Sequence, residues 1–252
     1  MKHLVLAGIL VCALGARAET VADGDGAEKA FKRGAQLMEK GRFKEAIPFL
    51  KEAEKVFSDN SSVLWNLGLA SAEVQNHRDA LSCWQKYCRF KPGDWMGIAK
   101  LVQAYQALGD FNARDREIKE LYARRAASKD SDLAKTDRFC REQFVVAGKK
   151  VFAFEIFEPR GERRIFYRFA ILDSKTGDET SFISLGSYDG TTQIARELGE
   201  IAESERIYHI DRYAGSAHES FAFFKAKPSY GTVREIVEEI MSGKAKAIAG
   251  SR

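Results

Sequence analysis

The residues best equipped for chemistry lie in the last quarter of the chain. His209 and Asp211 are two apart in the alternating run RIYHIDRY, so both side chains would point to the same face of a strand. An imidazole beside a carboxylate suits metal binding or proton transfer, and His218 is the nearest third candidate. Two candidate ligands and a third that is distant in the sequence are too few to indicate a metal-binding site. We therefore predict no metal site and place this pair on a solvent-exposed polar face.

Four carboxylates in the same half have the chemistry of a general acid or base. They are Glu155, Glu158, Asp173 and Asp189. Proton-transfer chemistry needs two groups within a few ångströms, and these residues fall at or near the ends of separate predicted strands. The sequence also has no G-x-S-x-G, H-E-x-x-H or P-loop motif. We predict no catalytic residue and no cofactor.

An enzyme is nevertheless the alternative hypothesis. A hydrolase-like enzyme acting on envelope material would need a deep pocket in the C-terminal half, or at its border with the rest of the chain. Such a pocket would collect Asp189, His209, Asp211 or His218. A filled sheet face would argue against it.

Arginine and phenylalanine residues mix in the segment that precedes these groups: Arg138, Arg141, Arg160, Arg163, Arg164 and Arg168, with Phe139, Phe144 and Phe166. An RNA-binding sheet uses such residues, because bases stack on aromatic rings beside cations. Neighbouring glutamates offset the local charge, and the whole chain carries only +4, from 40 basic and 36 acidic residues. We predict that the phenylalanines face packing helices, that the arginines face water and that no nucleic acid binds.

The first residues differ from the rest of the chain. Lys2 precedes an apolar run from Leu4 to Gly15, and Ala16-Arg17-Ala18 places small residues where a signal peptidase reads. A run of about a dozen residues is shorter than the roughly 20 that span a bilayer, so an uncleaved anchor is the weaker interpretation. We predict a signal peptide over residues 1–18, cleaved after Ala18, and a periplasmic or secreted protein without a membrane span.

Three cysteines follow the predicted cleavage site: Cys83, Cys88 and Cys140. Cys83 and Cys88 lie on one predicted helix, roughly 140° apart around its axis, so they should not bridge each other. Either of them could pair with Cys140 in an oxidising compartment. Buried free thiols are the favoured interpretation, and the pairing stays open.

The first half of the chain is organised by a repeat. Five pairs of residues stand 34 apart: Gly34 and Gly68, Ala46 and Ala80, Leu50 and Trp84, Ala53 and Tyr87, and Ser58 and Pro92. Glycine costs about 1 kcal/mol against alanine in a helix interior, so packing has to explain Gly68. Small residues at Gly68 and Ala80 would let two helices approach closely, with Trp84 beside them. Pro92 would end the second helix.

This pattern resembles the tetratricopeptide repeat, a helix, turn and helix of 34 residues. Three copies span residues 27–60, 61–94 and 95–128, and the middle copy matches most fully. The third has Val102 where a small residue belongs and Arg114 in place of alanine, so we expect a splayed or rotated hairpin. The resemblance implies a scaffold that binds a protein or peptide partner, and the predicted signal peptide implies that this scaffold is exported. The sequence leaves the oligomeric state open.

The resemblance further implies a groove on the inner face of the first helices. By the repeat phase, that face presents Phe31, Ala35, Met38, Trp65, Asn66, Leu69, Met96, Ala99, Lys100 and Gln103. Only Asn66 and Lys100 match the positions with which one variant of the family grips a peptide carboxylate. We predict an apolar groove anchored by Phe31, Trp65 and Leu69. The alternative is that the second domain packs there and makes these residues core.

From Arg138 the hydrophobic period changes from about 3.6 to about 2, which is typical of strands. We predict about four antiparallel strands between Arg138 and Leu185, a helix over 191–202, strands over 206–213 and 220–225, and a helix capped by Thr232 and Glu235 that stops at Gly243. This half resembles no family. The predicted fold is α+β with two domains: an all-α repeat stack over 27–128, a linker over 129–137, an antiparallel sheet domain with two packing helices over 138–243, and a tail over 244–252.

Overall fold

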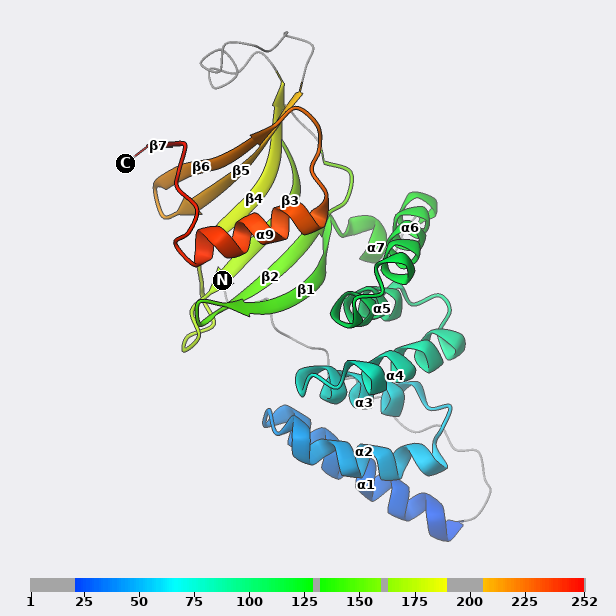
Figure 1. The fold of residues 1–252 in the computed structure, drawn as a ribbon. Coiled ribbons are helices and arrows are strands. Elements are labelled where there is room, and N and C mark those ends of the chain that lie inside the picture. Colours follow the sequence, from blue (N-terminus) through cyan, green and yellow to red (C-terminus); the bar gives the residue numbers. More distant parts are fainter. Residues whose placement is uncertain (1–20, 129–131, 160–162, 190–205, 252) are drawn as a thin grey trace. The chain divides into compact units, whose positions relative to one another are not determined.

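The computed structural model describes residues 21–128, 132–159, 163–189 and 206–251. The chain divides into two units, residues 1–127 and 128–252, and each unit has its own hydrophobic core (Figure 1). The predicted signal peptide, residues 1–18, lies outside the described residues. Within the described ranges, every helix is too short or too polar to cross a bilayer.

The first unit, which we call the stack, consists in its described part of three helical hairpins. They are α1 (Val21–Glu39) with α2 (Phe43–Val56), α3 (Ser61–Glu73) with α4 (His77–Phe90), and α5 (Trp95–Leu108) with α6 (Phe111–Ala127). Each helix packs against its hairpin partner, and α2 against α3 and α4 against α5 join the hairpins in order (Figure 1). The predicted arrangement of three hairpins side by side is confirmed.

Helix boundaries in the stack recur with the sequence period. The side-chain oxygen of Asn60 accepts a hydrogen bond from the Ser62 backbone N–H at 2.9 Å, which caps α3. Asp94, 34 residues later in the sequence, caps α5 in the same way through the Met96 N–H, also at 2.9 Å. Helix α4 ends at Phe90, two residues before Pro92, as predicted.

Close helix contact explains the glycine inside α3. A Cβ atom at Gly68 would lie 2.8 Å from Cζ2 of Trp84, closer than real Cβ contacts occur. Gly34 stands in the same relation to Leu50, again at 2.8 Å. A glycine at this position therefore lets a large side chain of the second helix lie directly on the backbone of the first.

The third hairpin departs from this scheme, as expected from its sequence. Val102 takes the glycine position and is fully buried. Arg114 donates a hydrogen bond to Gln106 of the preceding helix at 2.7 Å. Helix α6 continues to Ala127, and the predicted linker contains a further helical turn, α7 (Asp132–Lys135). The splay of this hairpin stays a prediction.

The second unit, which we call the sheet unit, is built on an antiparallel sheet. Its described strands run in sequence order: β1 (Arg138–Val146), β2 (Lys149–Ile156), β3 (Arg164–Leu172), β4 (Glu179–Asp189), β5 (Arg206–Ala214), β6 (Ala217–Phe224) and β7 (Ala249–Ser251). Six of these strands match the prediction. The seventh does not, because Ala249 in the predicted tail pairs with Ser220 of β6. The predicted helix over 191–202 lies outside the described residues.

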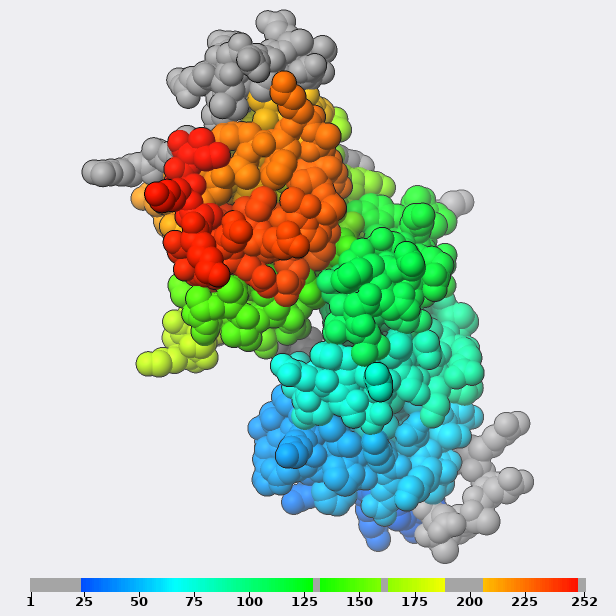
Figure 2. Space-filling model, in the orientation of Figure 1, coloured from blue at the N-terminus to red at the C-terminus, as the bar shows by residue number. Residues whose placement is uncertain are grey.

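Helix α9 (Tyr230–Met241) lies across one face of the sheet (Figure 1). Its buried Val233, Val237 and Ile240 pack with a row of strand residues that includes Phe169 and Leu185. Figure 2 shows the helix covering the strands beneath it, with the green strands β1 and β2 reaching the surface beside it. The helix ends at Met241, and Gly243, the predicted stop, follows two residues later with φ +71.

Two details of this unit correct the sequence prediction. The cap of α9 is Ser229, whose hydroxyl accepts from the Thr232 N–H at 3.1 Å, so the helix begins before the predicted Thr232. Arg141 does not face water: it is 3% exposed, and its guanidinium lies 2.6 Å from the Glu155 carboxylate. Phe144 and Phe166 do pack against the core beneath α9.

Candidate functional site

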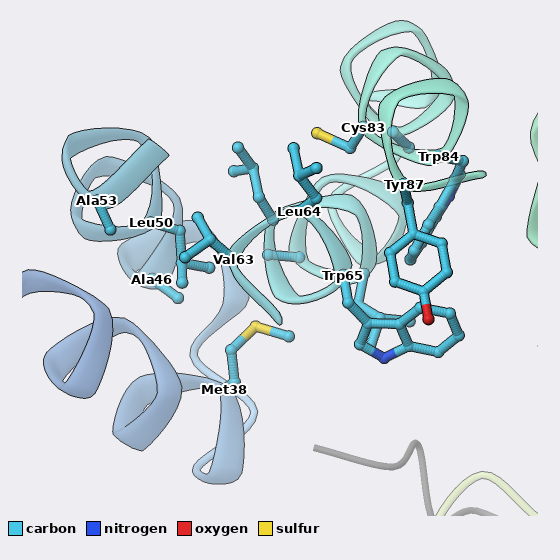
Figure 3. Packing of buried hydrophobic residues seen from close by; sticks show 14 of the residues in the cluster. Met38, Ala46, Leu50, Ala53, Val63, Leu64, Trp65, Cys83, Trp84 and Tyr87 are labelled. Carbon is cyan, nitrogen blue, oxygen red and sulfur yellow. The ribbon is translucent and has the colours of Figure 1, made fainter. Parts of the chain in front are cut away.

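The predicted inner-face residues lie deep in the stack. Phe31, Met38, Trp65 and Leu69 are between 5% and 7% exposed and belong to its hydrophobic core, and Ala35 and Ala99 are 8% exposed. The ring of Trp65 lies 5.0 Å from that of Trp84 and 5.1 Å from that of Tyr87 (Figure 3). The residues predicted as anchors, Phe31, Trp65 and Leu69, therefore pack in the core that holds the helices together.

The polar residues of this face differ in exposure. Asn66 is fully buried, and its side-chain N–H donates to the Ser62 carbonyl of its own helix at 2.9 Å. Lys100 and Gln103 are partly buried. Met96, at the first turn of α5, is 46% exposed. The predicted set thus consists of buried residues on α1 and α3, the buried Ala99 on α5, and three less buried residues on α5: Met96, Lys100 and Gln103.

The sheet unit gathers a polar cluster on the face opposite α9. Asp211 of β5 is its centre and is fully buried. Its Oδ2 lies 2.7 Å from His209 Nδ1, 3.2 Å from His218 Nε2 and 3.5 Å from the Arg163 guanidinium. Two hydroxyls donate to the same carboxylate, Tyr213 at 3.0 Å and Ser220 at 2.8 Å. One carboxylate therefore lies within 3.5 Å of five polar groups from five side chains.

Aromatic rings cover this cluster. The Tyr188 ring stacks on His209 at 4.2 Å, and the Tyr213 ring stacks on His218 at 4.7 Å. His209 is 1% exposed, and its ring lies so close to Gly186 on β4 that a Cβ there would be 3.1 Å from His209 Cε1. The prediction that His209 and Asp211 occupy a solvent-exposed face is wrong, because neighbouring side chains close over them.

The surroundings of Asp211 stabilise its charged form. Burial by itself raises the pKa of this carboxyl, but hydrogen bonding and charge from His209, with hydrogen bonds from Ser220 and His218, outweigh it and lower the pKa to about 2. The hydroxyl of Tyr213 has its pKa raised by burial and by the Asp211 charge, so it stays protonated and donates. The cluster is thus a buried polar core of the sheet face, centred on a charged Asp211.

This arrangement does not assemble a reactive group. Ser220 donates a hydrogen bond to Asp211 rather than to a histidine, so it lacks the adjacent base that activates a nucleophilic hydroxyl. Over the part of the chain that the structure describes, no three His, Cys, Asp or Glu side chains are placed to hold a metal ion. Asp189 ends β4, and its side chain is outside the described set.

Sequence reasoning missed three members of the cluster: Arg163, Tyr213 and Ser220. Tyr213 follows the same two-residue spacing as His209 and Asp211, so it could have been found. Ser220 faces Asp211 only through the pairing of β5 with β6, which has a bulge between Ile210 and Asp211. Arg163 precedes β3, outside any spacing rule. Their inclusion depends on strand register, which the sequence does not reveal.

The cysteines carry no bridge. Cys83, Cys88 and Cys140 are all free thiols. Burial raises the pKa of Cys83 to about 12 and that of Cys88 to about 11, so both thiols are protonated at neutral pH. The favoured interpretation of free, buried thiols holds for Cys83, and Cys88 and Cys140 are partly buried.

The period of the caps, the glycine contacts and the three hairpins together decide the nature of the first unit. It is a tetratricopeptide-like helical repeat. No protein-family model and no curated protein matches the sequence. The assignment of the first unit therefore rests on the geometry of its own repeats.

Several solved structures are similar to part of the chain. The second tetratricopeptide domain of Spaghetti (RPAP3), bound to an HSP90 peptide, is 16% identical, with 39% of this chain and 91% of that chain covered and a TM-score of 0.36. MamA is 21% identical, with 42% and 60% covered and a TM-score of 0.37. The N-terminal domain of stress-induced protein-1 from C. elegans is 15% identical, with 46% and 94% covered and a TM-score of 0.36.

Three of the predicted inner-face residues form a stripe on helix α5. Met96, Lys100 and Gln103 are spaced four and three apart on α5 and so share one side of that helix. The stripe combines an exposed thioether with a cation and an amide. Chemically it suits a partner that presents an apolar side chain next to a carboxylate or another hydrogen-bond acceptor.

Proposed function

We propose that this chain is an exported, non-enzymatic scaffold that binds a protein or peptide partner on the inner face of its tetratricopeptide-like stack. A solenoid packs each repeat only against its neighbours, and this leaves an extended surface along the first helices for a partner. The observation that carries the proposal is the α5 stripe, where Met96 is 46% exposed, whereas the predicted anchors Phe31, Trp65 and Leu69 are buried.

The residues that contact the partner in this proposal differ from the anchors predicted from the sequence. Met96 is the apolar anchor, and Lys100 and Gln103 supply polar contacts beside it. Phe31, Trp65 and Leu69 set the shape of the face by fixing the angle between neighbouring hairpins. A methionine suits this role because its flexible thioether adapts to different partners.

Site-specific photocrosslinking tests the contact. A photoreactive residue at position 96 is compared with one at Val56, which is 43% exposed at the end of α2 and away from the inner face. We expect one defined adduct from position 96 and none from position 56. The partner identified in this way is then titrated with purified protein. Met96→Glu should weaken binding at least tenfold, which is about 1.4 kcal/mol, and Val56→Glu should leave it unchanged.

Two results would refute the groove. One is equal crosslinking from both positions, and the other is unchanged affinity in the Met96→Glu variant. Because Met96 is exposed, its replacement does not disturb the core of the stack, so a loss of binding is separable from a loss of folding.

Export is tested separately. N-terminal sequencing of the protein purified from its native source should begin at Glu19, directly after the proposed cleavage at Ala18. Recovery of a chain that still carries residues 1–18 inside the cell would overturn the export part of the proposal and leave the binding part standing.

A further inference from the structure

The two edge strands of the described sheet, β1 and β6, differ in whether a further strand pairs with them. The β6 edge is extended by β7, which pairs with His218, Glu219 and Ser220. At the other edge, the described residues place no strand beside β1. The end of β1 carries Val145, whose 71% exposure is the highest of the large hydrophobic residues in the described ranges. An exposed strand edge with an apolar side chain is a site where another strand adds.

The hairpin that follows β1 determines which backbone groups face this edge. Ala147 and Gly148 have φ of 50 and 72, so they form the two-residue turn that joins Val146 to Lys149. Residues that flank such a turn exchange both of their hydrogen bonds, and the pattern alternates along the ladder. Phe144, paired with Val151, therefore bonds inward. The N–H and C=O groups of Gln143 and Val145 point outward.

We propose that this edge pairs with the same edge of a second copy, so that two sheet units form one continuous antiparallel sheet. In the register that uses all outward groups, Gln143 faces the partner's Val145, and Val145 faces the partner's Gln143. Each of these pairs exchanges two backbone hydrogen bonds, four in total. The two Phe144 residues then meet at the twofold axis as a non-hydrogen-bonded pair, with Cα atoms about 4.5 Å apart.

The charges of this strand end are compatible with pairing to itself. From Glu142 to Val146 the only ionised side chain is Glu142, and it is already held within its own unit. Tyr230 donates to its carboxylate at 2.6 Å and Arg234 at 2.8 Å. In the proposed register Glu142 faces the partner's Val146, so no like charges stand opposite each other. The occupant that fits both the hydrogen-bonding pattern and this neutrality is a second copy of β1.

Sedimentation equilibrium of the full mature chain across the micromolar range tests the proposal. The wild type should dimerise. Val145→Pro removes one outward N–H per chain without removing an inward bond, and it should shift the dimer dissociation constant at least tenfold toward monomer. Val145→Thr is the matched control, because threonine keeps the N–H and the preference for strands, and it should dimerise as the wild type does.

Amide hydrogen exchange in the wild type supplies an independent readout. The Gln143 and Val145 amides should exchange at least tenfold more slowly at high protein concentration. The inward Phe144 amide should be protected at every concentration. Three results would each overturn the proposal. The first is a wild type that is monomeric at every concentration, and the second is a Val145→Pro variant that dimerises as strongly as the wild type while the Phe144 amide stays protected. The third is rapid exchange of the Gln143 and Val145 amides within the dimer. If the Phe144 amide is no longer protected in the Val145→Pro variant, that variant does not test dimerisation. The hydrogen-exchange measurement on the wild type then decides whether the proposal stands.

Discussion

Replacing Gly68 with alanine should destabilise the stack, although alanine is the better helix former. Gly68 lies inside α3 and is buried. A methyl group there would meet three atoms of the Trp84 indole at 2.8 to 2.9 Å. The indole has no room to retreat, because Trp84 is 1% exposed and its ring is held 5.0 Å from that of Trp65 and 6.4 Å from that of Tyr87.

Two opposing effects set the magnitude. The helix interior gains about 1 kcal/mol when alanine replaces glycine. Overpacking of a rigid core costs about 1–3 kcal/mol. Since the obstacle is a fixed ring rather than the end of a flexible chain, the steric cost should fall in the upper part of that range. We expect Gly68→Ala to lower the free energy of unfolding of the stack by about 1–2 kcal/mol.

Urea unfolding followed by tryptophan fluorescence measures this change, because the chain has only Trp65, Trp84 and Trp95 and all three lie in the stack. Gly26→Ala is the matched control. Gly26 is also helical, in α1, and an added Cβ would meet nothing within 4 Å. That variant should gain about 0.5–1 kcal/mol, so the two substitutions should have opposite signs.

A double-mutant cycle tests the mechanism directly. In a Trp84→Phe background the smaller ring leaves space for the new methyl group, and Gly68→Ala should cost at least about 1 kcal/mol less than in the wild type. If Gly68→Ala is as stable as the wild type, or if its cost is the same in both backgrounds, then close approach of the hairpin helices does not explain the glycine.

Three further substitutions or conditions probe other parts of the chain. The pKa of Asp211 is about 2 in the folded protein against an ordinary 3.8, so this carboxylate should contribute about 2 kcal/mol to the free energy of unfolding. The contribution should be complete above pH 4 and disappear as the pH falls toward 2. Asp211→Asn should abolish that part of the pH dependence in calorimetry of the sheet unit. Glu155→Gln takes from Arg141 its buried carboxylate partner and should cost about 3 kcal/mol in thermal unfolding. Cys83, with its pKa raised to about 12 by burial, should resist alkylation at pH 8 until the stack unfolds, as mass spectrometry of labelled protein would show; rapid labelling of the folded protein would contradict its placement.

The repeat stack was predictable because its information is local and recurs. The first two units carry a glycine that faces a large side chain, Gly34 with Leu50 and Gly68 with Trp84, and the second and third carry a polar cap, Asn60 and Asp94. The strands were predictable for a similar reason, since alternation and turn residues are local. Helix α9 shifted by a few residues because Ser229 and Thr232 are both good caps, and only the path of the incoming chain chooses between them.

The polar cluster was not predictable to the same degree. A two-residue period places His209 and Asp211 on one face, but it does not say whether that face is covered. Coverage comes from Tyr188 of β4 and Tyr213 and His218 of the β5–β6 hairpin, and strand register brings them over the pair. The burial of Arg141 has the same origin, because Glu155 and Tyr230 reach it from another strand and from α9.

The burial of Trp65 alters how binding by the stack must be argued. Repeat phase placed this residue on the inner face, yet its ring packs against Trp84 and Tyr87 of the same hairpin and only 6% of it is exposed. A charge introduced there would be buried in an aromatic core, so lost binding would be indistinguishable from a lost fold. One period later the same phase falls on Ala99 of α5, which is also buried at 8% exposure, whereas Met96, three residues before it, is 46% exposed. Phase therefore identifies the side of a helix, and contacts with the neighbouring helices decide which residues of that side are core.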